Sequence, residues 1–210
     1  MRKNKTNLLN KVASYYTEKL EKHGDTPQGV DWNGGESQIV RFEQLCKIIN
    51  PKMPRFSIND LGCGYGALLD YLHDYHASCT YLGVDISSEM IASANERYKE
   101  VPHTSFTEAS EPDQQADFSV ASGIFNVRLD RSSNEWRDHI ENTLDILNRS
   151  SKIGFSFNCL TSYSDEDKKR DYLYYADPCQ LFDLCKRKYS RQVALLHDYG
   201  LYEFTILIRK

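Results

Sequence analysis

Residues 57–72, "SINDLGCGYGALLDYL", decide the fold. An acid, Asp60, precedes three alternating glycines, Gly62, Gly64 and Gly66, and an apolar helical pattern follows them. Glycine adopts backbone dihedrals that are closed to other residues and lets the chain approach a ligand closely. Three glycines in one turn cost conformational entropy, so a turn without a ligand is the less favoured interpretation. The stretch therefore predicts a strand, a tight ligand-binding turn and a helix.

Length and composition indicate a globular protein of one domain. The chain has 210 residues, of which 40% are hydrophobic and 27% charged, which is typical of globular domains. No apolar run reaches the ~20 residues of a membrane span, and the first residues lack the apolar core of a secretory signal. We therefore expect a cytoplasmic protein without a membrane partner. The net charge of −4 argues against a nucleic-acid partner, because duplex binders usually carry a basic face.

Cysteine and histidine positions do not predict a metal site. Six cysteines are scattered without a C-x-x-C pair, so we expect free thiols. His73 and His76 are three residues apart with Cys79 nearby. The solvated back face of a helix is the favoured interpretation of this pair, and no metal is predicted.

Strand and helix patterns alternate along the chain. Such alternation predicts an α/β fold with a parallel sheet and helices on both faces. Only "HDYG" separates the last two strands, so they form a hairpin and the final strand is antiparallel. We expect a seven-stranded, mostly parallel sheet within residues 51–210, preceded by helices in residues 1–50. Strands are predicted at 56–61, 80–85, 105–108, 116–123, 152–160, 191–196 and 201–209. Helices are predicted at 6–22, 36–49, 66–76, 88–98, 134–148 and 178–188, with Ser87 as the N-cap of the fourth.

Two ligands suit such a turn, a nicotinamide dinucleotide and S-adenosylmethionine. The dinucleotide pattern G-x-G-x-x-[GA] is met if Ala67 is its last position. However, an acid at the strand end would repel a pyrophosphate, whereas it suits an ammonium group. A short-chain reductase also needs a Tyr-x-x-x-Lys pair after the glycines, and the spacing that we find, Tyr15 to Lys19, precedes them. The residues favour S-adenosylmethionine.

The pattern Asp60-x-Gly62-x-Gly64-x-Gly66 resembles the first motif of class I S-adenosylmethionine-dependent methyltransferases. Motifs support the resemblance over residues 56–126, and the architecture extends it to residue 210. It implies a methyltransferase with S-adenosylmethionine as cofactor, in which residues 1–50 form an N-terminal helical lid and residues 51–210 the Rossmann-like core.

The resemblance also implies roles for the following strand ends. Asp85 ends the second strand and would accept from the ribose hydroxyls, with Ile86 against the adenine. Glu108 stands where the family often has Asp near the adenine amino group, so this position departs from the pattern; Ala109 is the small residue after it. Ser122 ends the fourth strand, where the methyl group is expected to face the acceptor.

A segment before the sheet, "DWNGGESQIVRF", resembles the N-terminal lid of small bacterial methyltransferases. Gln38 and Arg41 are three residues apart and share a helix face. Arg41 suits the cofactor carboxylate as a fork, and Trp32 suits a pocket wall. The alternative is a solvated Arg41 and a core Trp32.

The acceptor side is less clearly marked. Ligands of open α/β sheets bind at the carboxyl ends of the parallel strands, and the "HDYG" turn lies at that edge. We predict His197 and Tyr199 as catalytic residues, since His has the pKa range of a general base. An ordinary polar turn is the alternative. Other side chains near this edge are candidates for lining an acceptor pocket, namely Asn126, Arg128, Asn158, Tyr163, Tyr172, Tyr174 and Tyr175. Packing of a lid loop is the alternative for them.

The sequence thus predicts a methyltransferase that acts on a small-molecule acceptor, such as a hydroxyl of a sugar or natural-product intermediate. No Asn/Asp-Pro-Pro-Tyr tetrapeptide follows the fourth strand, which argues against amino methylation of nucleic-acid bases. Two alternatives remain, an NAD(P)-dependent oxidoreductase and a non-catalytic S-adenosylmethionine-binding partner protein. A homodimer is left open.

Overall fold

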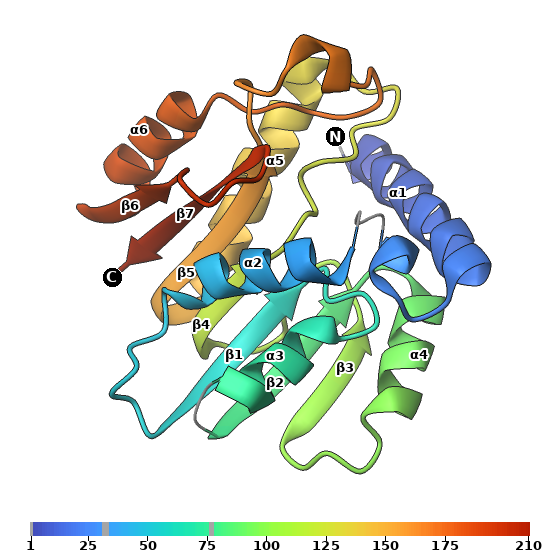
Figure 1. Ribbon diagram of the computed structural model, residues 1–210, viewed down its shortest axis with the longest axis vertical. Helices are drawn as coiled ribbons and strands as arrows, with labels where there is room; N and C mark the ends of the chain where they lie inside the picture. Colours follow the sequence, from blue (N-terminus) through green and yellow to red (C-terminus); the bar gives the residue numbers. More distant parts are fainter. Residues whose placement is uncertain (1, 31–33, 76–77) are drawn as a thin grey trace.

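A computed structural model describes residues 2–30, 34–75 and 78–210. Its centre is a seven-stranded sheet in the order β3-β2-β1-β4-β5-β7-β6. Six strands run parallel, and β7 is antiparallel to both of its neighbours. The predicted α/β sheet with a reversed last strand is confirmed (Figure 1). The strands are Arg55–Leu61 (β1), Ser78–Asp85 (β2), Thr104–Glu108 (β3), Ala116–Ala121 (β4), Ser151–Leu160 (β5), Gln192–Leu196 (β6) and Glu203–Arg209 (β7).

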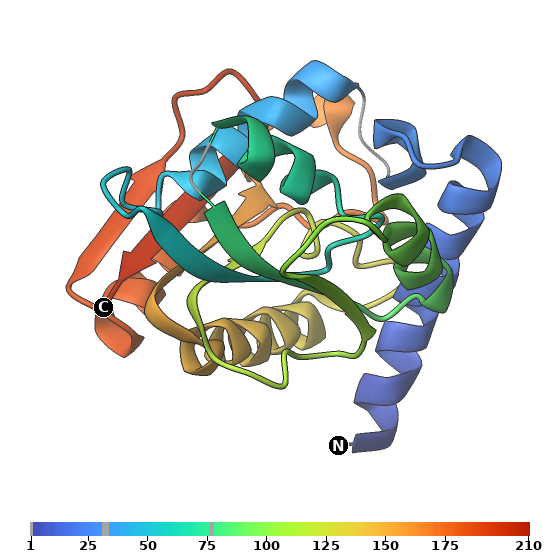
Figure 2. The ribbon, with the colours of Figure 1, turned by 90° about the horizontal axis from the view of Figure 1, so that it is seen from below.

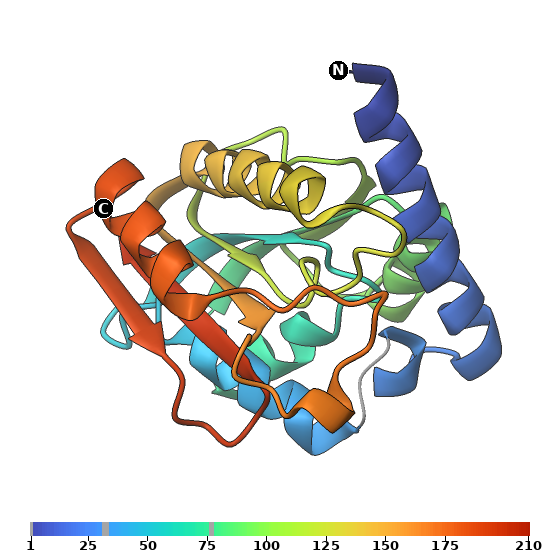
Figure 3. The same ribbon diagram turned by 90° about the horizontal axis from the view of Figure 1, so that it is seen from above.

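Helices cover both faces of this sheet (Figures 2 and 3). One face packs under α2 and α3, with a core that includes Phe42, Leu69 and Phe118. The other packs under α5 and α6, around Trp136 and Phe157. Among the helices that the structure describes, none has the length and apolar character that a membrane span needs. The helices are Arg2–His23 (α1), Gly35–Cys46 (α2), Ala67–Tyr75 (α3), Ser88–Arg97 (α4), Ser133–Ser150 (α5) and Pro178–Lys188 (α6), with short 3-10 turns at Pro27–Val30 (η1) and Glu166–Lys168 (η2).

Side-chain caps fix where several helices begin. Ser87 caps α4, as predicted, because its hydroxyl accepts from the Met90 amide. Ser132 and Glu135 form a capping box at the start of α5. Asp177 caps α6. Each of these caps therefore marks the residue after which its helix begins.

Several predicted boundaries differ from the structure, and two of these differences have a clear local cause. The helix expected to reach residue 49 ends at Cys46, since the amides of Ile48 and Ile49 bond three residues back in tight turns before Pro51. The strand expected to reach residue 123 ends at Ala121, because Gly123 has a φ of 75° and turns the chain out of the sheet. The second change brings the residues after β4 over the strand ends.

The carboxyl edge of the sheet is roofed by α1 and by two loops, residues 122–132 after β4 and 161–177 after β5 (Figure 3). The loops are joined by a bridge between Val127 and Leu173, and β7 begins at the same edge. The division into a lid of residues 1–50 and a core of residues 51–210 stays a prediction, although α1 and α2 do precede the sheet.

Candidate functional site

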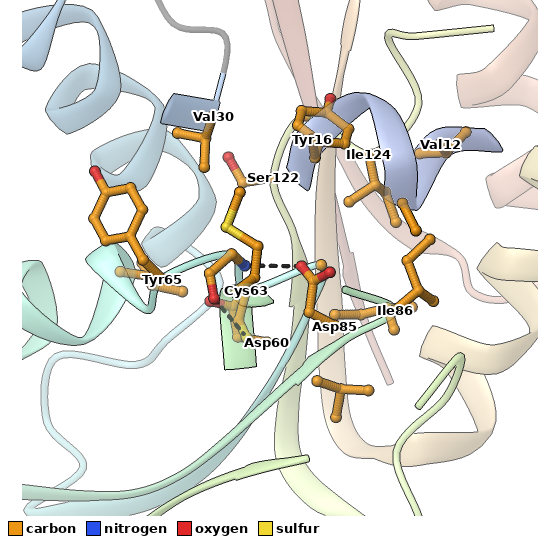
Figure 4. A pocket seen from close by; sticks show the side chains of 18 of the residues that line it. Val12, Tyr16, Val30, Asp60, Cys63, Tyr65, Asp85, Ile86, Ser122 and Ile124 are labelled. Carbon is orange, nitrogen blue, oxygen red and sulfur yellow. Dashed lines mark hydrogen bonds between the residues drawn. The ribbon is translucent and has the colours of Figure 1, made fainter. Parts of the chain in front are cut away.

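A cavity lies at the carboxyl ends of β1, β2 and β4 (Figure 4). The glycine turn forms one wall, and side chains from α1, including Val12 and Tyr16, form another. The structure thus brings together strand ends and helix α1, which are far apart in the sequence. Eight residues that the sequence predicts as cofactor-binding line this cavity: Gln38, Asp60, Gly62, Gly64, Asp85, Ile86, Ala109 and Ser122.

The glycine turn needs its glycines for two reasons. Gly62 and Gly66 have φ values of 78° and 86°, which strain any residue with a Cβ. A Cβ on Gly62 would also lie 2.1 Å from Cγ2 of Ile124, and one on Gly66 would lie 2.6 Å from Cε2 of Tyr98. Gly66 does not itself line the cavity. It supports the turn from behind, where the Tyr98 hydroxyl donates to its carbonyl.

Asp60 is a buried acid on the floor of the cavity. The residue is 3% exposed, and its carboxylate accepts a 2.6 Å hydrogen bond from the Tyr81 hydroxyl. Burial raises the pKa of Asp60 to about 7, and the charge of Asp85 adds to the rise while Tyr81 opposes it. This side chain therefore titrates near neutral pH.

Asp85 connects the glycine turn to the start of α4. One carboxylate oxygen accepts from the Gly64 amide and the other from the Ser87 amide, both at 2.9 Å. Burial raises the pKa of Asp85, and these amides oppose the rise. Among the described groups that shift the pKa of Asp60 and Asp85, none is a cation. The two acids make the cavity electronegative, so it favours a ligand that carries positive charge.

The lid residues divide between the cavity and the core. Gln38 lines the cavity, and its amide nitrogen lies 3.4 Å from the hydroxyl of Tyr65, a second lining residue. The Arg41 guanidinium instead forms a bidentate ion pair with Glu203, with both N–O distances at 2.8 Å. Arg41 does not line the cavity, because its fork already holds a protein carboxylate. Trp32 lies outside the described residues.

Several lining residues were not predicted. Cys63 and Tyr65 sit between the glycines of the turn. His139 and Thr143 reach the cavity from α5 beside Ile86 and Ala109, as does Ile124 from the loop after β4. His139 and Thr143 are four residues apart on α5, next to its buried residues Ile140 and Leu144. The spacing places both residues on one helix face, but it does not show that this face meets the cavity.

Glu108 lies away from this group. It ends β3 in register with Asp85, but its side chain is exposed and does not line the cavity. Ala109, the next residue, is partly buried and lines the cavity instead. The predicted adenine contact of Glu108 stays a prediction that the arrangement of these side chains does not favour.

The two residues predicted as catalytic lie at the β6–β7 turn, outside the cavity lining. His197 is exposed, with its ring centroid 5.9 Å from that of Tyr163. Tyr199 is half-buried, with its hydroxyl 3.1 Å from Oγ1 of Thr205. Burial raises the pKa of Tyr199 well above the usual value, so the phenol stays protonated near neutral pH. Their catalytic roles remain predictions.

Three polar residues considered for the acceptor pocket bind other parts of the protein. The Asn126 side chain accepts from the Leu160 amide. The Arg128 guanidinium donates to the carbonyls of Leu173, Arg131 and Asp171. Asn158 accepts from the Gly123 amide at 2.7 Å. These side chains tie together the loops that roof the carboxyl edge.

Comparisons with known proteins agree with the fold and the cavity. Residues 58–169 match the family described as a methyltransferase domain. A protein of Mycobacterium tuberculosis named "Putative methyltransferase Rv1506c" is 63% identical over 164 residues, which cover 78% of this chain and 98% of that protein.

Solved structures show the same fold at low sequence identity. The N-methyltransferase NodS of Bradyrhizobium japonicum, in complex with S-adenosylhomocysteine, has a TM-score of 0.65 at 16% identity and covers 94% of this chain and 97% of its own. Magnesium protoporphyrin IX methyltransferase of Synechocystis, also with S-adenosylhomocysteine, has a TM-score of 0.65 at 13% identity and covers 98% and 100%. The chain belongs to the methyltransferase domain family, which confirms the predicted class I S-adenosylmethionine-dependent methyltransferase.

Proposed function

We propose that the chain transfers a methyl group from S-adenosylmethionine, held in the cavity at the glycine turn, to a small-molecule acceptor. One observation carries this proposal: two acids, the buried Asp60 and the partly buried Asp85, line the cavity, and no described cation is among the groups that shift their pKa values. S-adenosylmethionine has an ammonium and a sulfonium group, so its positive charge offsets the cost of burying these carboxylates.

The residues of the cavity fit this cofactor. Asp60 would hold the ammonium group. Asp85 would accept from the ribose hydroxyls, because each of its oxygens has a lone pair beyond the one that a backbone amide uses. Ile86 and Ala109 would contact the adenine. Gln38 and the Tyr65 hydroxyl offer donors for the carboxylate, in place of Arg41.

The chemistry divides between cofactor and protein. S-adenosylmethionine, when bound, supplies a methyl group that is already electrophilic. The chain orients the acceptor and excludes water, which contributes up to several kcal/mol to lowering the barrier. Ser122 lines the same cavity, and its buried hydroxyl has no hydrogen-bond partner among the described residues (Figure 4). Such a hydroxyl is available to a ligand.

The acceptor is inferred to be small because of charge and access. The chain carries a net charge of −4, and the carboxyl edge is roofed by α1 and two joined loops rather than open to a duplex (Figure 3). We propose a hydroxyl of a sugar or natural-product intermediate as the acceptor, which a general base at this edge would deprotonate. His197 is proposed for that role, whereas the raised pKa of Tyr199 suits it to donate a hydrogen bond.

The test is methyl transfer from radiolabelled S-adenosylmethionine to a panel of sugars, phenols and amino compounds, with transfer RNA and bulk protein in parallel reactions. We expect label in a small-molecule fraction, and we expect Asp85→Asn to abolish it. Label in RNA or protein alone would contradict the acceptor class. Cofactor binding without transfer to any fraction would favour the non-catalytic partner protein instead.

A further inference from the structure

A buried polar network lies beneath the acceptor side of the cavity. Glu203, the first residue of β7, is 2% exposed and receives the fork of Arg41 from α2. Its Oε2 also accepts from Nδ2 of Asn158 at 3.1 Å. Oδ1 of Asn158 in turn accepts from the Gly123 amide at 2.7 Å. Four segments, α2, β5, β7 and the loop after β4, thus meet in one chain of hydrogen bonds.

This network is a costly way to obtain stability. Burying an ion pair requires desolvation of both charges, and apolar side chains of similar volume often stabilise a core as well or better. A buried pair can instead fix a unique arrangement. Here Arg41 holds both carboxylate oxygens of Glu203 from α2, and Asn158 donates to Oε2 from β5. The network thus sets the position of Asn158 and, through it, of Gly123.

Gly123 belongs to the turn that faces the cofactor. Ser122, Gly123 and Ile124 all line the cavity. Ile124 also packs against the glycine turn, since its Cγ2 occupies the space where Gly62 would carry a Cβ. A displacement of Gly123 would therefore move the cavity wall between the cofactor and the acceptor loops.

We propose that Asn158 and Glu203 are positioning residues for methyl transfer, which hold the turn 122–124 against the reacting end of the cofactor through the Gly123 amide. This inference rests on the proposed function. Arg41 serves the same purpose from α2, by fixing the carboxylate of Glu203. None of the three needs to touch the acceptor.

The test uses the whole chain with S-adenosylmethionine labelled with ¹³C at its methyl group. The readouts are the methyl signal of the bound cofactor and the amide signal of Gly123 by NMR, with the dissociation constant from calorimetry. Asn158→Leu removes the acceptor of the Gly123 amide and keeps the side-chain volume. We expect an upfield shift of that amide proton, a displaced methyl signal and a dissociation constant within about threefold of wild type, a change under 1 kcal/mol.

Asn59→Leu is the matched control. Asn59 is also a fully buried amide that ties segments together, because it donates to the carbonyls of Gln114 and Ser150, but it does not line the cavity. We expect Asn59→Leu to lower thermal stability about as much as Asn158→Leu does. The methyl signal of the bound cofactor should stay at its wild-type position in this control. Glu203→Gln, which keeps the shape of the side chain, is the second test variant if Asn158→Leu does not fold.

Three results are decisive. A methyl signal at the wild-type position in Asn158→Leu, or in Glu203→Gln if Asn158→Leu does not fold, would overturn the positioning role. Equal displacement in the Asn59→Leu control would also overturn it, since it would reduce the effect to general destabilisation. A wild-type chain that binds no S-adenosylmethionine would instead refute the proposed function itself, and the inference with it.

Discussion

The cofactor side and the acceptor side of the carboxyl edge are built in different ways. On the cofactor side, Asp60, the glycines and Asp85 come from two adjacent strand ends within 26 residues of sequence. On the acceptor side, hydrogen bonds join Gly123 to a residue 35 positions away and Arg41 to one 162 positions away. A ligand with fixed chemistry can be held by a local motif, whereas a loop-built acceptor site depends on contacts between distant segments.

The glycine turn gives the largest expected effect. Gly62→Ala combines a positive φ with a Cβ only 2.1 Å from Ile124. We expect a loss of roughly 2–4 kcal/mol in unfolding free energy and at least about 100-fold in S-adenosylmethionine affinity. Thermal melts and calorimetric titration measure both.

Gly200→Ala is the matched control for this substitution. Gly200 has a similar φ of 74°, but a Cβ there would meet nothing within 4 Å. The substitution adds backbone strain without a steric clash. We expect it to lower the free energy of unfolding by about 1 kcal/mol and to leave cofactor affinity unchanged. Equal effects of the two variants would show that strain alone, and not a close approach, makes Gly62 necessary.

Asp60→Asn tests the electronegative cavity with the next largest effect. Removing the carboxylate should weaken S-adenosylmethionine binding by about 10- to 100-fold, the range of a charged hydrogen bond. The same change should stabilise the cofactor-free protein near pH 8, because a buried charge is removed. A variant that binds normally and melts at the wild-type temperature would contradict the placement of the ammonium group.

The pH dependence of Asp60 follows from its pKa of about 7. An acid with a folded-state pKa above its unfolded value of about 3.9 loses stability as pH rises between these two values. Wild-type stability without cofactor should therefore fall from about pH 4 to pH 7, by up to roughly 4 kcal/mol from this group. Affinity for S-adenosylmethionine should rise over about pH 5.5 to 7.5. Asp60→Asn should flatten both profiles, and profiles of wild-type slope in that variant would assign the titration to another group.

Arg128→Ala tests whether the acceptor side can be loosened without an effect on the cofactor side. The guanidinium of Arg128 holds carbonyls of two loops, so we expect a loss of about 1–2 kcal/mol in stability. Hydrogen exchange should accelerate in residues 171–174, while cofactor affinity stays within about twofold. A large fall in cofactor affinity would show that the two sides are not separable in this way.

His197→Ala should have the smallest effect on folding and on cofactor binding. The side chain is exposed, so stability should change by less than about 0.5 kcal/mol. Turnover with an identified hydroxyl acceptor decides its proposed role. A tenfold or greater loss near neutral pH at unchanged affinity would support a general base, and normal turnover across that range would end this assignment.

The sequence predicted most of the fold because its signals are local. Strand and helix alternation, the glycine turn and the cap at Ser87 each depend on neighbouring residues, and the structure reproduces them. The same holds for Asp60, Asp85 and Ile86, which line the cavity by virtue of standing at strand ends.

What sequence could not supply were side-chain partners from distant segments. Arg41 was expected to bind the cofactor, and no local pattern shows that Glu203, far along the chain, takes its fork. Asn158 and Arg128 were considered for the acceptor pocket. Their hydrogen-bond partners lie in other loops, so the sequence could not show that both side chains are already engaged. His139 reaches the cavity through the register of α5 against the sheet, which helical periodicity alone does not fix.

Calorimetric titration of the wild-type chain with S-adenosylmethionine, S-adenosylhomocysteine and NAD tests the central claim most directly. The electronegative cavity at the glycine turn should bind the first two with micromolar dissociation constants and show no heat of binding for NAD, whose pyrophosphate the acids repel. Binding of NAD without the other two would contradict the account of the cavity, and the positions assigned to Asp60 and Asp85 would be wrong with it.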